Sequence, residues 1–316
     1  YSLEKNTTFI GGQLQENDLN IKIKNLAGFL ENSIVTKNYK IPPIIASVPL
    51  NISVKSKQNA GAISLEKLLI ESEAIYAQGS GSMGSSTNLI NLDFAFIDLN
   101  KLLAPTDIKS ILKSDFPLLL SINNPQVNFN VTITKMLASQ EVLQNIQLIL
   151  SAGALKQLSG NFASGGRFSA SGLLSSNPYR SMFEGSINFE HNDINLLLSN
   201  LNLLDYTSDK QQLNNTFSSK VIATNLDLQL LNFIYKVNGA TLSGNLHTQI
   251  FANKPCIRGL IKLDNLDFAN NSYPIISKLL SYSNNIIPYK NNDYKVQVAK
   301  IKPEILSGNL ELMFTN

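Results

Sequence analysis

The chain has 316 residues, a formal net charge of +3, 16 % charged residues and 8 % aromatic residues, with no tryptophan. So small a positive charge, with only three arginines, gives no indication of nucleic-acid binding. The apolar share of 43 % is too high for a disordered chain, and the length is compatible with two domains or with one long β body.

Cysteine content and chain start restrict the class of protein further. Cys256 is the only cysteine, which excludes an internal disulfide framework and a cysteine metal cluster. The longest apolar stretches, such as Ile41–Leu50 with its prolines, are too short to span a membrane. The chain begins at Tyr1 with neither an initiator methionine nor a signal peptide, so we expect a fragment or a mature form whose anchor lies outside it.

Alternating apolar and polar residues predict β-strands along most of the chain. The pattern is clear at 50–55, 127–134 and 294–299. Such strands form sheets with one polar and one apolar face. Short combinations of Gly, Asn and Pro predict turns between them, at Gly11-Gly12, Asn59-Ala60-Gly61, Gly165-Gly166, Asn177-Pro178 and Asn238-Gly239. The third and fifth of these turns are expected to be two-residue hairpin loops.

A nucleotide-binding pattern occurs once, at Gly79, Gly81 and Gly84, which match Gly-x-Gly-x-x-Gly. A dinucleotide site needs this pattern between a strand and a helix, so that the phosphate meets the helix N-terminus. Here the next segment, Leu89–Leu99, alternates as a strand. We therefore interpret the glycines as part of a Gly/Ser-rich hairpin.

Short helices are predicted where strands end at an acidic residue. The segments 98–103 and 193–198 both read Asp-(Leu/Ile)-Asn followed by leucines, and 264–280 is a looser version. The aspartate can cap such a helix. A further short helix is expected at 106–113.

These elements suggest soft boundaries near Pro105 and Tyr206. They divide the chain into a first β unit at 1–104 that ends in a short helix, a second at 105–205 and a third at 206–316. We expect the three units to form one continuous body built from repeats.

The sequence Leu-Ser-Gly-Asn occurs three times, at Leu158–Asn161, Leu242–Asn245 and Leu306–Asn309, each time followed by a large apolar residue. Alternation places Leu and Gly on the apolar face of a strand. A glycine there indicates a bulge or a close approach to the backbone. The copies are unevenly spaced, which argues against a solenoid of fixed period.

No catalytic or metal site is predicted. His191 and His247 are far apart in the sequence, and each is interpreted as a lone surface histidine. No serine lies in Gly-x-Ser-x-Gly, and Cys256 is interpreted as an ordinary thiol. Neither a cofactor nor an enzymatic activity is expected, because no cluster of convergent polar residues can be recognised.

The alternation leaves two architectures open. In a closed β-sandwich, the apolar faces of two sheets fill one another. In a long twisted sheet curved into a trough, the apolar face stays available for lipid acyl chains, which apolar transfer at about 25 cal/mol per Å² would favour. The predicted fold class is mainly β, with antiparallel strands and a few short helices.

The repeat resembles the AsmA-like family of Gram-negative envelope proteins, which includes the TamB-type proteins. The resemblance rests on the Leu-Ser-Gly-Asn strands, on the hairpin 165–172 (Gly-Gly-Arg-Phe-Ser-Ala-Ser-Gly) and on the steps at Asp98 and Asp193. It covers the chain from about Val48 onward. This chain departs from the family pattern in carrying Asn100 and Asn195 in these steps and in lacking the N-terminal membrane helix.

The resemblance implies a periplasmic β-groove, tethered to the inner membrane by a segment outside this chain, that guides phospholipids toward the outer membrane. It further implies a role in outer-membrane biogenesis, an envelope or outer-membrane protein partner, and no nucleic acid. The groove lining would include Val127, Phe129, Val131, Ile133, Phe162, Leu242, Leu246, Ile250, Leu310 and Leu312. The alternative function is that of a structural or adhesive secreted β-protein, which would show coils of regular length.

Overall fold

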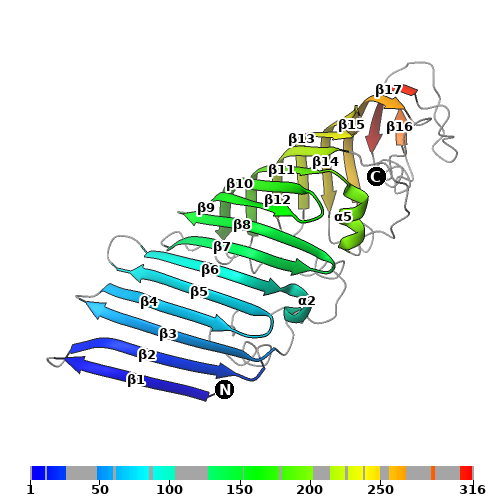
Figure 1. Cartoon of the computed structure of the whole chain (residues 1–316). Helices are drawn as coiled ribbons and strands as arrows, with labels where there is room; N and C mark the ends of the chain where they lie inside the picture. Colours follow the sequence, from blue (N-terminus) through cyan, green and yellow to red (C-terminus); the bar gives the residue numbers. More distant parts are fainter. Residues whose placement is uncertain are drawn as a thin grey trace.

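The computed structural model describes residues 2–10, 13–25, 48–59, 62–84, 88–103, 127–151, 153–177, 180–201, 214–224, 227–237, 239–249, 256–267, 286–288 and 307–314. Within these residues, seventeen strands form one open sheet, and two short helices lie at the ends of its strands (Figure 1). The predicted fold class is confirmed.

The strands that precede the first helix are β1 (Ser2–Ile10), β2 (Gln13–Ile23), β3 (Leu50–Asn59), β4 (Ala62–Glu71), β5 (Ile75–Met83) and β6 (Asn88–Asp98). Helix α2 (Leu99–Leu102) is followed by β7 (Val127–Ala138), β8 (Glu141–Ser151), β9 (Ala154–Phe162), β10 (Gly166–Asn177) and β11 (Arg180–His191). Helix α5 (Ile194–Asn200) is followed by β12 (Asn215–Thr224), β13 (Asp227–Val237), β14 (Ala240–Gln249), β15 (Cys256–Asp267), β16 (Ile286–Pro288) and β17 (Ser307–Phe314).

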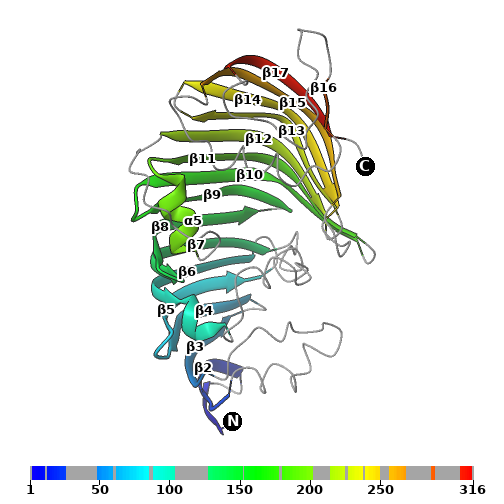
Figure 2. The ribbon, with the colours of Figure 1, turned by 90° about the vertical axis from the view of Figure 1, so that its right-hand side faces the viewer.

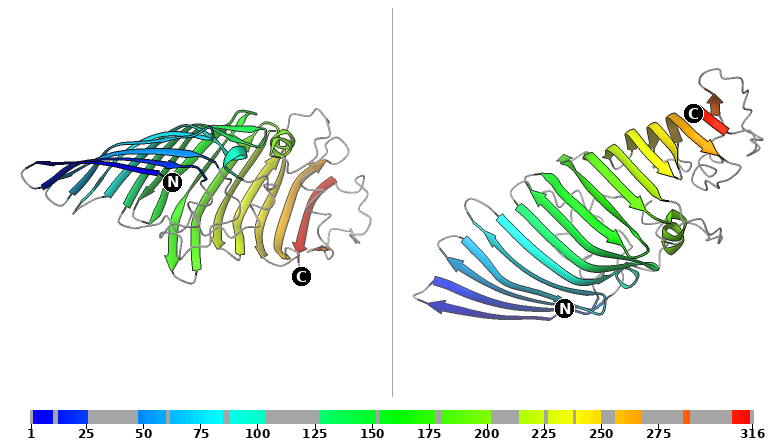
Figure 3. Two further views of the ribbon diagram at one scale, coloured as in Figure 1. Left: turned by 90° about the horizontal axis from the view of Figure 1, so that it is seen from below. Right: turned by 45° about the horizontal axis from the view of Figure 1, so that its top comes forward.

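Strand order in the sheet follows chain order almost throughout. Each strand from β1 to β14 pairs with the next one along the chain, β15 pairs with β17, and β17 pairs with β16. The sheet twists continuously from β1 to β17 (Figure 3), and its later strands arch more strongly than the first ones (Figure 2). Because all described strands belong to this sheet, the described residues contain no second sheet that would complete a sandwich.

The β6–β7 pair is parallel, whereas the other pairs are antiparallel. Asn88 pairs with Val127, so β7 begins beside the residue at which β6 begins. Both helices lie at the opposite end, where β6 and β11 finish (Figures 1 and 2). We call this end of the strands the helix rim. The hydrogen-bonded ladder continues across both of the boundaries suggested by the sequence.

The register carries one apolar and one polar face from strand to strand. Phe168 lies between Gly160 and Phe189, while its neighbour Arg167 lies between Asn161 and Glu190. Burial follows the same alternation. In β13, the side chains at 233, 235 and 237 are at most 9 % exposed, whereas those at 234 and 236 are exposed. This agreement defines the apolar face and the polar face of the sheet.

Each Leu-Ser-Gly-Asn copy lies opposite a β-bulge in the strand that precedes it in the sheet. In β14, Asn245 faces two residues of β13, Leu231 and Asn232. Asn232 has a left-handed φ of 50°, and its backbone N–H donates to Oδ1 of Asn245 at 2.8 Å. In β15 the bulge at Asn265 (φ 57°) likewise lies opposite Asn309, and in β8 the bulge at Asn145 (φ 52°) lies one residue along, opposite Gly160. Asparagine tolerates this conformation better than most residues do.

The bulged strands share a pattern of their own, Leu-x-Asn followed by an apolar residue. It occurs at 143–146, 230–233 and 263–266. In each pair the first leucine lies opposite the apolar residue that follows Leu-Ser-Gly-Asn. The recurring unit is therefore a pair of strands, of which the four-residue repeat marks only the second. Bulges bend and twist a sheet locally.

Glycines on the apolar face accommodate close approaches, as the sequence predicted. A Cβ on Gly160 would lie 2.7 Å from Cζ of Phe168, because the aromatic ring lies against the backbone of β9. Gly172 and Gly185 face each other across β10 and β11, and a Cβ on either would lie within 2.8 Å of the Phe183 ring. An inward bend crowds the side chains of one face, and glycines relieve that crowding.

Of the predicted turns, Gly11-Gly12, Ala60-Gly61 and Pro178 lie outside the described residues. Val237 at the end of β13 pairs with Ala240 at the start of β14, which agrees with the predicted two-residue hairpin loop. Gly79 and Gly81 lie in β5, followed by a strand and not by a helix. The Gly165-Gly166 prediction was wrong in detail. Gly166 already pairs with Phe162, so the loop has three residues, because Gly165 (φ 106°) ends the turn. The helix predicted at 106–113, most of the segment 264–280 and the strand at 294–299 lie outside the described residues.

Candidate functional site

The apolar face is the candidate site, and the register brings most of the predicted groove residues onto it. Val127, Phe129, Val131, Ile133, Phe162, Leu242 and Leu246 all lie on this face. Leu310 and Leu312 occupy register positions opposite Leu263 and Ile261. Ile250 lies outside the described residues.

Apolar residues on this face form rows that run across the strands. The central row is an unbroken chain of register partners from β2 to β11, made of Leu19, Val54, Leu68, Gly79, Leu92, Val131, Leu148, Leu158, Ala170 and Ile187. All of these residues are half-buried. A single layer of apolar side chains packed edge to edge, with one side uncovered, has this degree of exposure.

A second row, the inner row, lies one step nearer the helix rim. Its members over β6 and β7, Phe94 and Ile133, are half-buried like the central row. Over β13 to β15, Tyr235, Leu242 and Leu263 are only 9 %, 2 % and 2 % exposed. Leu242 therefore belongs to a packed core in this structure.

An outer row lies on the other side of the central row and includes Ile90, Phe129 and Leu150, which are register partners and half-buried. Over β13 and β14 the outer row still offers half-buried residues, Leu230 and Leu246. The apolar surface therefore narrows from three half-buried rows at β6–β7 to one at β13–β14.

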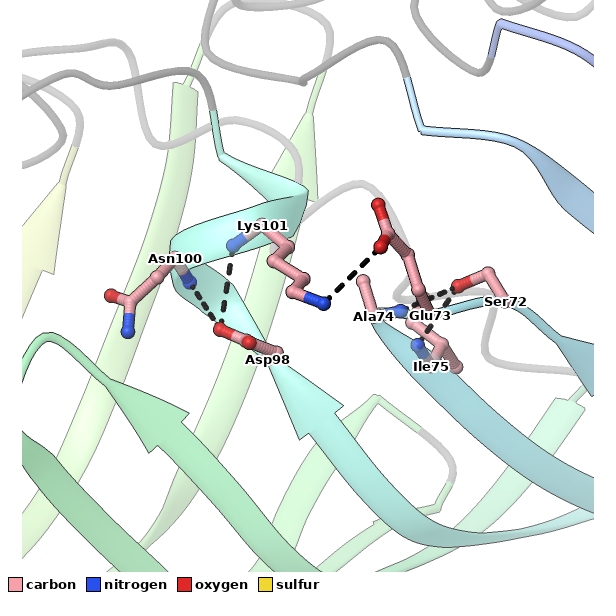
Figure 4. Close-up of polar contacts among 7 residues, drawn as sticks. All are labelled: Ser72, Glu73, Ala74, Ile75, Asp98, Asn100 and Lys101. Carbon is pink, nitrogen blue, oxygen red and sulfur yellow. Dashed lines mark hydrogen bonds and ion pairs between the residues drawn. The ribbon is translucent and has the colours of Figure 1, made fainter.

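Helix α2 forms one part of the helix rim (Figure 4). Asp98 caps the helix as predicted, because its Oδ1 accepts from the backbone N–H of Asn100 and of Lys101. The Lys101 ammonium lies 3.2 Å from the carboxylate of Glu73 in the turn between β4 and β5. Both of these side chains are well exposed, so the pair contributes little to stability.

Both helices hold the turn that joins β7 to β8. The Asn100 side chain donates to the Ser139 carbonyl at 2.9 Å and accepts from the Ser139 N–H at 2.7 Å. From the other helix, the Asn200 carbonyl accepts from the Gln140 N–H at 2.9 Å, and its side chain donates to Glu141 at 2.7 Å. Ser139 has a left-handed φ of 56°, which these contacts hold in place.

The second predicted helix, α5, is also capped as expected, with Asp193 Oδ1 accepting from the Leu196 N–H at 3.0 Å. Ile194 and Leu197 are buried on its inner side. Asn195 of this helix corresponds in sequence to Asn100, but the hydrogen bonding of its side chain differs. The Asn195 Oδ1 is buried and has no hydrogen-bond partner among the described residues.

A buried polar cluster lies beside α5, and the sequence did not predict it. His191 is 0 % exposed and Glu141 is 1 % exposed. The prediction of a surface histidine at 191 was therefore wrong. The residue ends β11 on the apolar face, where its ring packs against Phe162 and Phe189. Tertiary packing of α5 and the β9–β10 turn decides this burial, which no local pattern reports.

Hydrogen bonds fix the tautomer of His191. Its Nδ1 accepts from the Asp193 N–H at 2.9 Å, so the ring proton of the neutral form resides on Nε2. Nε2 lies 2.9 Å from Ser164 Oγ and donates to it. A histidine that activates a serine must instead accept the hydroxyl proton. The contact is therefore a structural link between β11 and the β9–β10 turn.

Burial sets the ionisation of two groups in this cluster. Desolvation lowers the pKa of His191, and the nearby carboxylates of Glu141 and Asp193 partly oppose that change. Desolvation raises the pKa of Tyr235. The Tyr235 hydroxyl donates to Oδ1 of the fully buried Asn215. The cluster at the helix rim therefore combines an uncharged imidazole, a neutral phenol and amides with the buried side chain of Glu141.

The second histidine is more ordinary, in line with its interpretation as a surface residue. His247 lies on β14 with a side-chain exposure of 38 %, and its Nε2 lies 3.2 Å from Asp227. In the part of the chain that the structure describes, no group of three or more His, Cys, Asp and Glu residues is arranged to hold a metal ion. Among the same residues, no helix has the length and apolar character needed to cross a bilayer.

The chain was compared with protein-family models, with curated proteins and with solved structures, and no match was found in any of the three.

Proposed function

We propose that this protein binds lipid acyl chains on its apolar face and guides phospholipids between the inner and outer membranes of a Gram-negative envelope. One observation carries the proposal. A single open sheet presents an apolar row of half-buried side chains across ten consecutive strands, β2 to β11. The resemblance to AsmA-like proteins supports the periplasmic setting, tethering through a segment outside this sequence, and an envelope protein partner.

The size of this apolar surface favours a hydrocarbon ligand. Monomeric soluble proteins rarely expose contiguous apolar patches of more than a few hundred Å². Hydrocarbon placed on the face would be stabilised by about 0.8 kcal/mol for each CH₂ group removed from water. Binding of this kind needs no reacting group, so the proposed function is passive guidance and not catalysis.

The test compares two neighbouring residues on opposite faces of β7. Val131 belongs to the central row, whereas Asn130 is exposed on the polar face, next to Asn91. A glutamate at 131 places a charge on the lipid path, which is costly to desolvate. We expect Val131→Glu to lower phospholipid transfer between vesicles about tenfold, the equivalent of about 1.4 kcal/mol, and Asn130→Glu to leave transfer near the unmodified level.

Native mass spectrometry of protein purified without detergent gives an independent readout. Bound phospholipid is expected in the unmodified protein and in Asn130→Glu, but not in Val131→Glu. Absence of lipid from all three proteins would refute the proposal. If the loss of folding stability in Val131→Glu, expressed as a free energy, is as large as the loss of transfer, the result would instead indicate a packed core at this position.

A further inference from the structure

Side chains on the apolar face are more closely spaced within a row than between rows. Along a row, neighbouring residues belong to adjacent strands about 4.8 Å apart. Between rows, the residues are two positions apart on one strand, which is about 6.8 Å. Side chains therefore touch within a row and form ridges, and the furrows between ridges run across the strands. A methylene chain that follows a furrow contacts apolar side chains on both sides.

The central row also has a definite end. Its last half-buried apolar member is Ile187 in β11, whose partner in β12 is Ser219. Ser219 is 6 % exposed, and its hydroxyl donates to the Lys220 carbonyl at 2.7 Å. Beyond it, on the same face of β13 and β15, Phe233 and Ile261 are 4 % and 2 % exposed. The row is half-buried over β2–β11, whereas its members in β12, β13 and β15 are buried.

We infer that the acyl chains lie across the strands, in the furrows beside the central row of β2–β11, and that this track ends at β12. This inference rests on the proposed function and adds to it the orientation, the extent and the class of the ligand. Nine strand spacings make the track about 43 Å long. Such a track suits long unbranched hydrocarbon chains, whereas a rigid fused-ring lipid is too broad to enter a furrow between ridges.

Small residues support a chain that runs in this direction. Gly79 and Ala170 are members of the central row, on β5 and β10. They lower the ridge without interrupting it, since their partners Leu92 and Leu158 continue the row. A chain oriented along a strand would instead have to cross from one ridge to the next at every second residue.

Photo-crosslinking from the protein tests the extent of the track. A photoreactive phenylalanine analogue replaces Val131, Leu148 or Ile187 in the open part, Phe233 or Ile261 in the closed part, and Asn130 on the polar face as control. The probe is vesicles of dioleoyl phosphatidylethanolamine and dioleoyl phosphatidylglycerol. We expect lipid adducts at the three open positions, at least fivefold above those at the closed and control positions.

The outcomes separate the two proposals. No adduct above the Asn130 background at any position would overturn the proposed function and the inference together. Adducts of equal yield at Phe233, Ile261 and the open positions would leave lipid binding intact and refute the end of the track at β12. Half-exposed positions are expected to tolerate the substitution, and the unfolding midpoint of each variant verifies its folding. If the Val131 variant does not fold, the result at Leu148 is used in its place.

Crosslinking from the lipid tests the orientation. Two phosphatidylcholine probes carry a diazirine near the middle or at the end of one acyl chain, and the modified residues are located by mass spectrometry. Between the two probes, we expect the modified sites to move from one strand to another within the central row. Displacement along a single strand would refute the transverse orientation. Competition by palmitic acid but not by cholesterol is expected; equal competition would contradict the assignment to unbranched chains.

Discussion

The β6–β7 and β13–β14 pairs have the same alternation of residues but very different burial. On the apolar face of β6 and β7, residues such as Leu92, Phe94 and Val131 are half-buried. On that of β13 and β14, Phe233 and Leu242 are 4 % and 2 % exposed. The comparison teaches that alternation specifies which side chains share a face, while the curvature and packing of the sheet decide whether that face is closed.

Local geometry distinguishes the two regions. The β13–β14 pair contains a bulge at Asn232, held by Asn245, and lies in the strongly arched part of the sheet (Figure 2). The β6–β7 pair is parallel, and no bulge interrupts its register from Asn88 to Phe94. Bending brings the side chains of the inner face together, so the same apolar residues form a core in one region and an open surface in the other.

Truncation of apolar residues should show the largest difference in stability between the two regions. Leu242→Ala removes a fully packed side chain and should lower the free energy of unfolding by about 2–5 kcal/mol. Leu92→Ala removes a half-exposed one and should cost roughly 1 kcal/mol. Urea unfolding followed by circular dichroism measures both. Similar losses would mean that the two regions are equally packed.

A glycine substitution tests the close approach between β10 and β11. In Gly185→Ala the new Cβ would lie 2.2 Å from the Ser171 carbonyl oxygen and 2.6 Å from the Phe183 ring. Relieving this clash should cost about 1–3 kcal/mol, the usual range for overpacking. The thermal or urea midpoint is the readout, with Ser186→Ala on the polar face as the matched control. A loss no greater than that of the control would contradict the proposed crowding.

The bulge in β13 gives a smaller expected effect. Asn245→Ala removes the acceptor for the Asn232 N–H, which should lower stability by about 0.5–1.5 kcal/mol. Asn245→Asp keeps an acceptor oxygen at that position and should retain most of the stability. If both variants unfold at the same urea concentration, the side chain does not stabilise the bulge through this hydrogen bond.

The pH dependence of stability tests the cluster at the helix rim. Burial lowers the pKa of His191 below 6.5, so the folded protein binds fewer protons at this site than the unfolded chain. Stability should therefore fall as the pH decreases from about 6.5 to the folded pKa, and this contribution should not change further below it. Coulombic attraction from Glu141 and Asp193 reduces the effect.

The measurement is the urea midpoint between pH 8 and pH 5 at constant ionic strength. His191→Gln should flatten the slope, whereas His247→Asn, at the exposed histidine, should preserve it. An unchanged slope in His191→Gln would assign the pH dependence to other groups.

Local patterns in the sequence predicted much of the fold. Asp98 and Asp193 were identified as caps because an aspartate before a short leucine-rich segment can satisfy free backbone N–H groups. The glycine at position 3 of the repeat was identified as a point of close approach, which Gly160 and Phe168 confirm. By contrast, the burial of His191 and the bulge at Asn232 could not be predicted, because they depend on pairing with distant segments.

The sequence by itself determined the two faces, since alternation with period two separates apolar from polar side chains in any extended strand. It also indicated two positions at which the chain reverses between strands, the hairpin between Val237 and Ala240 and the turn that ends at Gly165. Only the tertiary structure decided that the strands form one open sheet, that β6 and β7 are parallel, and where the apolar face is closed. Those features depend on register and curvature, which arise from contacts between residues far apart in the chain.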